Sequence, residues 1–117
     1  MSLPEHDWRL LRSSHDAALG RYCARVLEEC AAVIQDADSS AHDRYLRLFR
    51  LIKERDERVA AAFDDLRRST AIQRLAAMIN LGVIADVELA QFSQATRESA
   101  TALAEILGPS EKGRKAR

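Results

Sequence analysis

The histidines and cysteines are the residues of this chain best suited to metal binding or nucleophilic chemistry. His6, His15 and His42 stand far apart in the 117-residue sequence, and no Glu-x-x-His pair occurs. A di-metal carboxylate site in a helical bundle needs such a pair on an inward face. Cys23 and Cys30 lie on one predicted helix, about 10 Å apart at ~1.5 Å per residue, which is too far for a disulfide. We therefore expect no metal site and no cofactor.

His15 followed by Asp16 is the neighbouring pair that comes nearest to a catalytic arrangement. Adjacent residues on a helix point about 100° apart, so Asp16 is poorly placed to orient His15. The spacing of His15 puts it in an apolar stripe, which favours a packed histidine. The four glycines are scattered and form no phosphate-binding loop. These patterns predict a protein that is not an enzyme.

The composition indicates one soluble helical domain, which we expect over residues 1–108. Hydrophobic residues make up 47% of the chain and charged residues 31%, a balance typical of packed amphipathic helices. Lysine and arginine number 18, as do aspartate and glutamate, so the chain as a whole does not attract an anion. No apolar run approaches the roughly 20 residues that span a bilayer. We expect a cytoplasmic protein without membrane contact, with both cysteines reduced.

Two long stretches of helix-period hydrophobicity dominate the first half of the chain. They run from Trp8 to Ala37 and from Tyr45 to Leu66, and the polar residues 36–40 join them. The two serines of this joint can cap the second helix. The pattern predicts a long antiparallel helical hairpin over residues 5–67.

Residues 70–107 carry shorter helical patterns, which predict two or three helices packed on the hairpin in an all-α helical bundle. The residues that should mark the helix ends are Thr70 with Gln73 as a capping box, Gly82 as a C-terminal stop, and Asp86 and Ser93 as N-terminal caps.

A polar layer is expected within the hairpin, because Arg55 interrupts the apolar stripe of the second helix. Folding the chain at the joint brings together pairs of residues whose numbers add to about 77, which places Arg55 near Tyr22. We hypothesise a Tyr22–Arg55 cation–π contact or a polar layer that fixes the register. In the alternative interpretation, Arg55 simply extends along its stem to solvent.

The hairpin should expose more apolar area than the short C-terminal helices can cover. Its two helices would be about 45 and 40 Å long at ~1.5 Å per residue. A strip of small residues on the first helix would also allow a second backbone to approach closely, in preference to a kink at Gly20. We therefore predict a homodimer. The candidate interface residues are Trp8, Leu11, Ala17, Gly20, Ala24 and Ala31.

The leading hypothesis is thus a non-enzymatic protein–protein interaction or adaptor protein that dimerises through its long helices. A nucleic-acid-binding regulator is the first alternative. It would use the basic tail, residues 109–117, which we expect to be mobile, and the corner at Arg67 and Arg68. Residues 72–92 superficially match a helix-turn-helix, but residues 86–92 hold two acids and no lysine or arginine, so they would repel phosphate. We therefore favour a protein partner over nucleic acid.

A helical ligand sensor is the second alternative. Its pocket would be formed by the aromatic residues Trp8, Tyr22, Phe49 and Phe63. The competing interpretation is that these rings simply fill the core.

Overall fold

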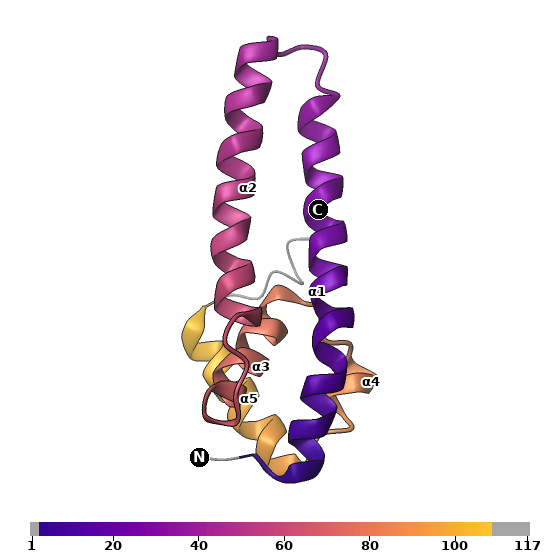
Figure 1. The fold of residues 1–117 in the computed structure, drawn as a ribbon, viewed down its shortest axis with the longest axis vertical. Helices are drawn as coiled ribbons and strands as arrows, with labels where there is room; N and C mark the ends of the chain where they lie inside the picture. The colour runs from indigo at the N-terminus through magenta and orange to yellow at the C-terminus, as the bar shows by residue number, and fades with distance from the viewer. Residues whose placement is uncertain (1–2, 109–117) are drawn as a thin grey trace.

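The computed structural model describes residues 3–108, and its regular structure in that range is helical throughout (Figure 1). The predicted all-α bundle is confirmed. The elements are α1 (Glu5–Ile34), α2 (Ala41–Phe63), a 3-10 helix (Arg68–Thr70), α3 (Ala71–Leu81), α4 (Asp86–Leu89) and α5 (Gln94–Leu107).

Helices α1 and α2 form the predicted antiparallel hairpin (Figure 1). Helix α1 runs without interruption for 30 residues, so Gly20 does not break it. It ends at Ile34, three residues before the expected Ala37, and α2 ends at Phe63 rather than at Leu66. The Ser40 hydroxyl accepts a hydrogen bond from the Asp43 N–H at 3.0 Å, which is the N-cap expected for α2.

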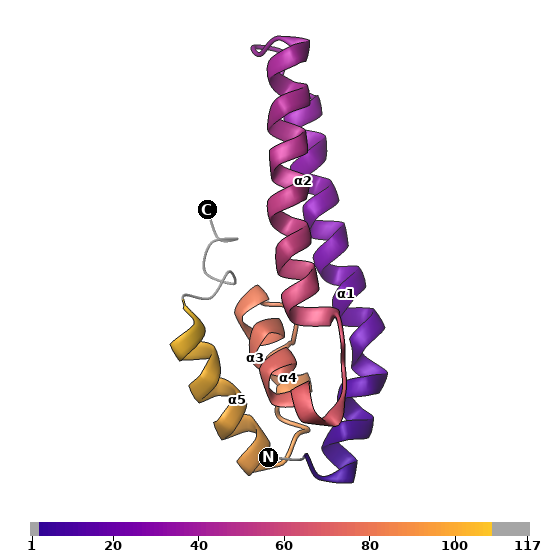
Figure 2. The ribbon, with the colours of Figure 1, turned by 60° about the vertical axis from the view of Figure 1, so that its left-hand side comes forward.

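The shorter helices pack on one end of this hairpin (Figure 2). We call this end, residues 5–22 of α1 and 59–63 of α2, the proximal half, and residues 23–58 the distal half. The proximal half shares one core with α3 and α5. The largest contributors to this core are Leu11, Tyr22, Phe63, Leu75, Met78 and Phe92. The distal half extends beyond the shorter helices, and Cys30 is the only buried side chain within residues 23–58.

Two of the predicted helix ends in the C-terminal part are confirmed. Gly82 adopts the left-handed conformation, with φ of 70°, after the last residue of α3. The Ser93 hydroxyl accepts from the Thr96 N–H at the start of α5.

The other two predicted capping interactions do not form, although Thr70 does hold the N-cap position of α3. The Thr70 hydroxyl does not cap α3, because it donates to the Asp65 carbonyl at 2.7 Å and accepts from the Arg67 N–H at 3.0 Å. Asp86 is the first residue of α4, and Ala85 holds the N-cap position.

Arginine side chains satisfy the carbonyl groups at the C-terminal ends of three helices. Arg44 donates to the Ile34 carbonyl at the end of α1, at 2.6 Å. Arg25 donates to the Leu81 and Gly82 carbonyls at the end of α3, at 2.5 and 3.3 Å. The corresponding contacts at the end of α2 come from Arg74, which donates to the carbonyls of Ala61 and Asp64. A helix leaves its last four carbonyls without partners, so each arginine stabilises one helix end through another element.

Within residues 3–108, no helix combines the length and the apolar character needed to cross a bilayer.

Candidate functional site

Large apolar side chains are exposed along one face of the distal half, which we call the distal face. Leu27 and Ile34 of α1 are 67% and 52% exposed. Tyr45, Phe49 and Ile52 of α2 are 66%, 59% and 49% exposed. Solvent-exposed apolar groups on one patch favour burial against another molecule.

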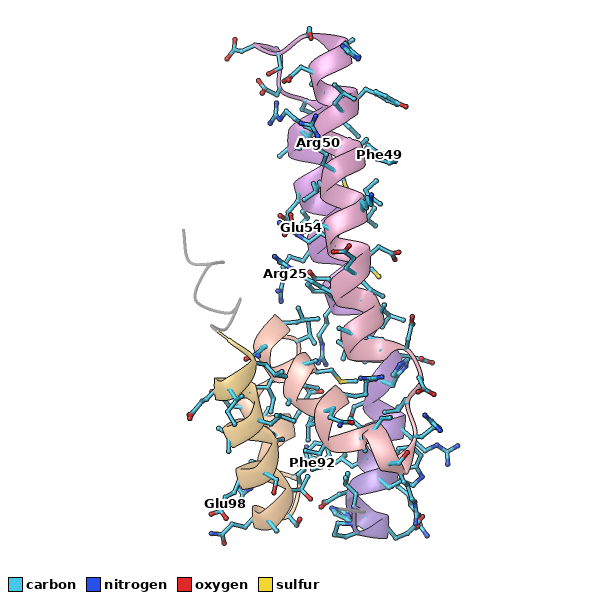
Figure 3. All side chains as sticks on the ribbon, turned by 90° about the vertical axis from the view of Figure 1, so that its left-hand side faces the viewer. Arg25, Phe49, Arg50, Glu54, Phe92 and Glu98 are labelled. Carbon is cyan, nitrogen blue, oxygen red and sulfur yellow. The ribbon has the colours of Figure 1, made fainter. Side chains whose placement is uncertain are left out.

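The distal face contains a shallow groove of about 270 Å³ between α1 and α2. Its lining is mainly apolar and consists of Cys23, Val26, Leu27, Cys30, Ile52, Arg55, Asp56 and Val59. In Figure 3, Phe49 points away from the side of the hairpin on which α5 lies, whereas Arg25, Arg50 and Glu54 point toward that side. The C-terminal helices therefore leave the distal face uncovered.

Two polar groups of α2 lie on or beside the distal face. The Tyr45 hydroxyl and the Asp56 carboxylate take part in no hydrogen bond or ion pair with any of residues 3–108. Both side chains are exposed, so water satisfies them in a single copy of the chain.

Arg55, which we expected to contact Tyr22 in a polar layer, binds a different residue. The Arg55 guanidinium donates to both carboxylate oxygens of Glu29 on α1, at 3.2 and 2.8 Å. These hydrogen bonds raise the pKa of Arg55 above its ordinary value. The guanidinium over the Tyr22 ring belongs to Arg25, at 5.6 Å from the ring centroid. Arg55 thus joins the two helices through a carboxylate and not through the tyrosine ring.

The residues predicted for the dimer interface fall into three environments. Leu11 is fully buried in the core of this chain, so it is a correction to the expected surface. Trp8 is half-buried at the proximal end, with the guanidinium groups of Arg12 and Arg68 at 5.8 and 5.9 Å from its ring centroid. The small residues, Ala17, Gly20, Ala24 and Ala31, are all exposed.

Within residues 3–108, no other segment packs closely on the small-residue strip at Gly20. A Cβ atom added at Gly20 would meet nothing within 4 Å. The close approach predicted for this strip therefore does not occur within one copy of residues 3–108.

The four rings proposed for a ligand sensor do not surround one pocket. Tyr22 and Phe63 lie in the core of the proximal half, whereas Phe49 is exposed on the distal face. Trp8 lies in the first turn of α1, in the proximal half, whereas Phe49 projects from the distal half (Figure 3).

The basic corner proposed for nucleic acid is paired with carboxylates. Arg67 donates to Asp65 at 2.8 Å, and Arg68 forms an ion pair with Glu5. The basic tail, residues 109–117, lies outside the described residues.

His15 is a packed histidine, as its spacing indicated. Its Nε2 lies 2.9 Å from the Phe63 carbonyl oxygen, and its ring contacts the Phe63 ring edge-on at 5.5 Å. Contrary to expectation, the Asp16 carboxylate does reach Nδ1, at 3.1 Å. The two partners of the ring are thus a backbone carbonyl and an exposed carboxylate, and neither is a hydroxyl or thiol that the imidazole could activate.

The buried carboxylate of Asp7, which the sequence did not single out, connects the start of α1 with the start of α5. Asp7 of α1 accepts hydrogen bonds from the Ser93 N–H at 2.9 Å and from the Ser93 and Thr96 hydroxyls, each at 2.6 Å. Burial raises the pKa of Asp7, but these hydrogen bonds outweigh burial and lower it below its ordinary value. The only sequence signal was an acid in the first turn of a helix, which is common at exposed helix ends.

The described part of the chain contains no candidate metal site. No group of three or more His, Cys, Asp or Glu side chains in residues 3–108 is placed to hold an ion.

No protein-family model, no curated protein and no solved structure matches this chain, so the distal face itself is the basis for an assignment of function.

Proposed function

We propose that this chain is a non-enzymatic protein–protein interaction protein that associates with a second copy of itself through the distal face. The observation that carries the proposal is the run of five large apolar side chains, each about half exposed or more, on a part of the hairpin that no other element covers. A soluble monomer rarely exposes a contiguous apolar patch of this kind.

A second copy fits this surface for two reasons. A two-helix hairpin with one apolar face is half of a four-helix bundle, and another hairpin supplies the missing half. Equal numbers of cationic and anionic residues, 18 of each, also mean that two copies do not repel each other by net charge. The predicted dimer is thus retained, and its interface moves from Leu11 and the small-residue strip to the distal face.

The mass of the particle in solution tests the proposal. We expect the wild-type chain at micromolar concentration to show twice its 13.1 kDa mass in light scattering and in sedimentation equilibrium. The substitution Ile52→Glu should give the monomer mass with an unchanged helical circular dichroism spectrum, because it places a charge in the centre of the interface.

Ile106→Glu is the matched control, because Ile106 is also an exposed isoleucine but lies on α5, away from the distal face. This variant should remain dimeric. A monomer mass for the wild-type chain would refute self-association and leave the face to another partner.

A further inference from the structure

The distal face of α2 carries the spacing of a coiled-coil seam. Tyr45, Phe49, Ile52, Asp56 and Val59 recur at alternating intervals of four and three residues. This alternation keeps side chains on one stripe of a helix, and in coiled coils the stripe inserts into a partner helix. Three of these side chains, Tyr45, Phe49 and Ile52, are about half exposed or more, so this part of the seam is not covered by other elements within residues 3–108.

The polar groups of the seam stand on either side of its apolar centre. Tyr45 and Asp56 are eleven residues apart, about three helical turns, so they point in nearly the same direction at ~100° per residue. Phe49 and Ile52 lie between them. Burying the Asp56 carboxylate without a hydrogen-bond donor would be costly, whereas a tyrosine hydroxyl is a suitable donor.

We propose that α2 packs antiparallel against α2 of a second copy, about a two-fold axis that crosses the helix midway between Phe49 and Ile52. This inference rests on the self-association proposed above and specifies its geometry. The numbers of two residues that face each other across this axis then add to 101. Phe49 packs on the partner's Ile52, and the Tyr45 hydroxyl donates to the partner's Asp56 carboxylate.

One axis satisfies both pairs, and each pair occurs twice. In a two-fold interface, a contact from one position to a second implies the reverse contact from the second to the first. The two apolar pairs form the centre, and the two tyrosine–aspartate pairs close it on either side. The exposed hydroxyl and carboxylate, which water satisfies in a single copy, thus become partners in the dimer.

An axis parallel to the hairpin would not produce these pairs. Each residue would then face its own copy at the same level along the axis. Tyr45 would stay about 16 Å from the partner's Asp56, because eleven residues rise that far at ~1.5 Å each. Asp56 would then face the same level of the partner's groove, where the strong donor, Arg55, already donates to the carboxylates of Glu29 and Glu54.

Charge-swap variants distinguish the two axes. Tyr45→Glu should weaken dimerisation by about ten-fold or more, because it opposes two carboxylates, and Asp56→Lys should weaken it because the ammonium group replaces a hydrogen-bond acceptor. The double variant should recover to within about three-fold of the wild-type dissociation constant through two glutamate–lysine pairs. Coupling within a single helix is negligible, because about 16 Å exceeds the screening length of ~8 Å at physiological salt.

The control combines Tyr45→Glu with Glu57→Lys, since position 57 neighbours Asp56 but lies outside the seam. This pair should not recover. Small-angle X-ray scattering gives a second readout, because the monomer is 52 Å long. Antiparallel overlap of the distal halves gives a maximum dimension of about 70 Å, whereas a parallel arrangement stays close to the monomer length.

The possible failures are distinct. A wild-type monomer would overturn both the proposed function and this geometry. A wild-type dimer that shows neither recovery in the double variant nor the longer dimension would overturn the antiparallel geometry alone.

Discussion

The two halves of the hairpin are built from similar amphipathic helix and yet differ in how they are stabilised. In the proximal half, Leu11, Ala18 and Tyr22 of α1 are fully buried against α3 and α5. In the distal half, Leu27 and Ile34 of the same helix are more than half exposed. Two causes combine: Leu27 and Ile34 lie on another side of α1 from Leu11, and the shorter helices, which come from residues far away in the sequence, cover only the proximal half.

Polar groups follow the same division. The proximal half uses Asp7 to fix the start of α5, through hydrogen bonds between residues 86 and 89 positions apart. In the distal half, contacts such as Arg55 with Glu29 and Arg47 with Asp36 stay within the hairpin, whereas Arg25, next to the proximal half, reaches the end of α3. Stability therefore depends on long-range contacts at one end and mainly on contacts between the two helices at the other.

Two leucines of α1 test this comparison with the largest expected effect. Leu11→Ala should lower the free energy of unfolding by about 2–5 kcal/mol, because it leaves a cavity in a close-packed core. Leu27→Ala should change it by less than about 0.5 kcal/mol in the monomer, because the side chain is mostly exposed.

Urea unfolding at concentrations below the dimer dissociation constant measures both leucine variants. Leu27→Ala should instead weaken dimerisation. Equal losses of stability in the two variants would contradict the division into a packed and an unpacked half.

Asp7→Asn tests the long-range hydrogen bonds of the proximal half. It should lower the free energy of unfolding at neutral pH by about 1–3 kcal/mol, because it removes a charged acceptor from three donors. The pKa of Asp7 is lowered on folding from its ordinary value of 3.8. The stabilisation is therefore fully present above that value and is lost as the pH falls through the lower, folded-state pKa.

Thermal unfolding of wild type and Asp7→Asn across the acid range checks this sign. The difference between the two proteins should narrow as the pH falls below 3.8. A difference that stayed constant with pH would show that the carboxylate charge does not contribute.

Gly20→Ala gives the smallest effect and sharpens the assignment of the interface. It should raise the free energy of unfolding by about 0.5–1 kcal/mol, because alanine favours a helix interior and nothing opposes a Cβ at this position. Ala24→Gly should lower it by a similar amount. Neither should alter the dimer mass, and a loss of dimer in Gly20→Ala would return the interface to the small-residue strip.

Local sequence patterns were enough to predict most of the fold. The helical period, the Ser40 and Ser93 caps and the left-handed Gly82 act within a few residues, so they could be recognised without knowledge of the tertiary structure. Thr70 shows the limit of this approach. The Thr70 hydroxyl could either cap α3 or bond to the preceding loop. In the structure it donates to the carbonyl of Asp65, a loop residue with φ of 55°, and does not cap the helix.

The candidate site was predictable only in outline. Periodicity indicated a surplus of apolar area on the hairpin, but it could not show which part of the stripe the C-terminal helices would cover. Leu11 lies in the main stripe of α1 and Leu27 at its widened edge, about 160° round the helix at ~100° per residue, and the pattern could not show that α3 and α5 would cover only the proximal half. Asp7 was missed for the same reason, since its partners lie in α5.

The arginines at the helix ends form contacts that lysine in the same positions would not reproduce. Arg25 reaches two carbonyl oxygens with two different nitrogens of one planar group, and Arg74 does the same with a second pair. A lysine ammonium is a single point of charge on a flexible stem and does not reproduce that fork. Replacing arginine by lysine at these positions keeps the charge of the chain but removes hydrogen bonds that hold the helix ends to neighbouring elements.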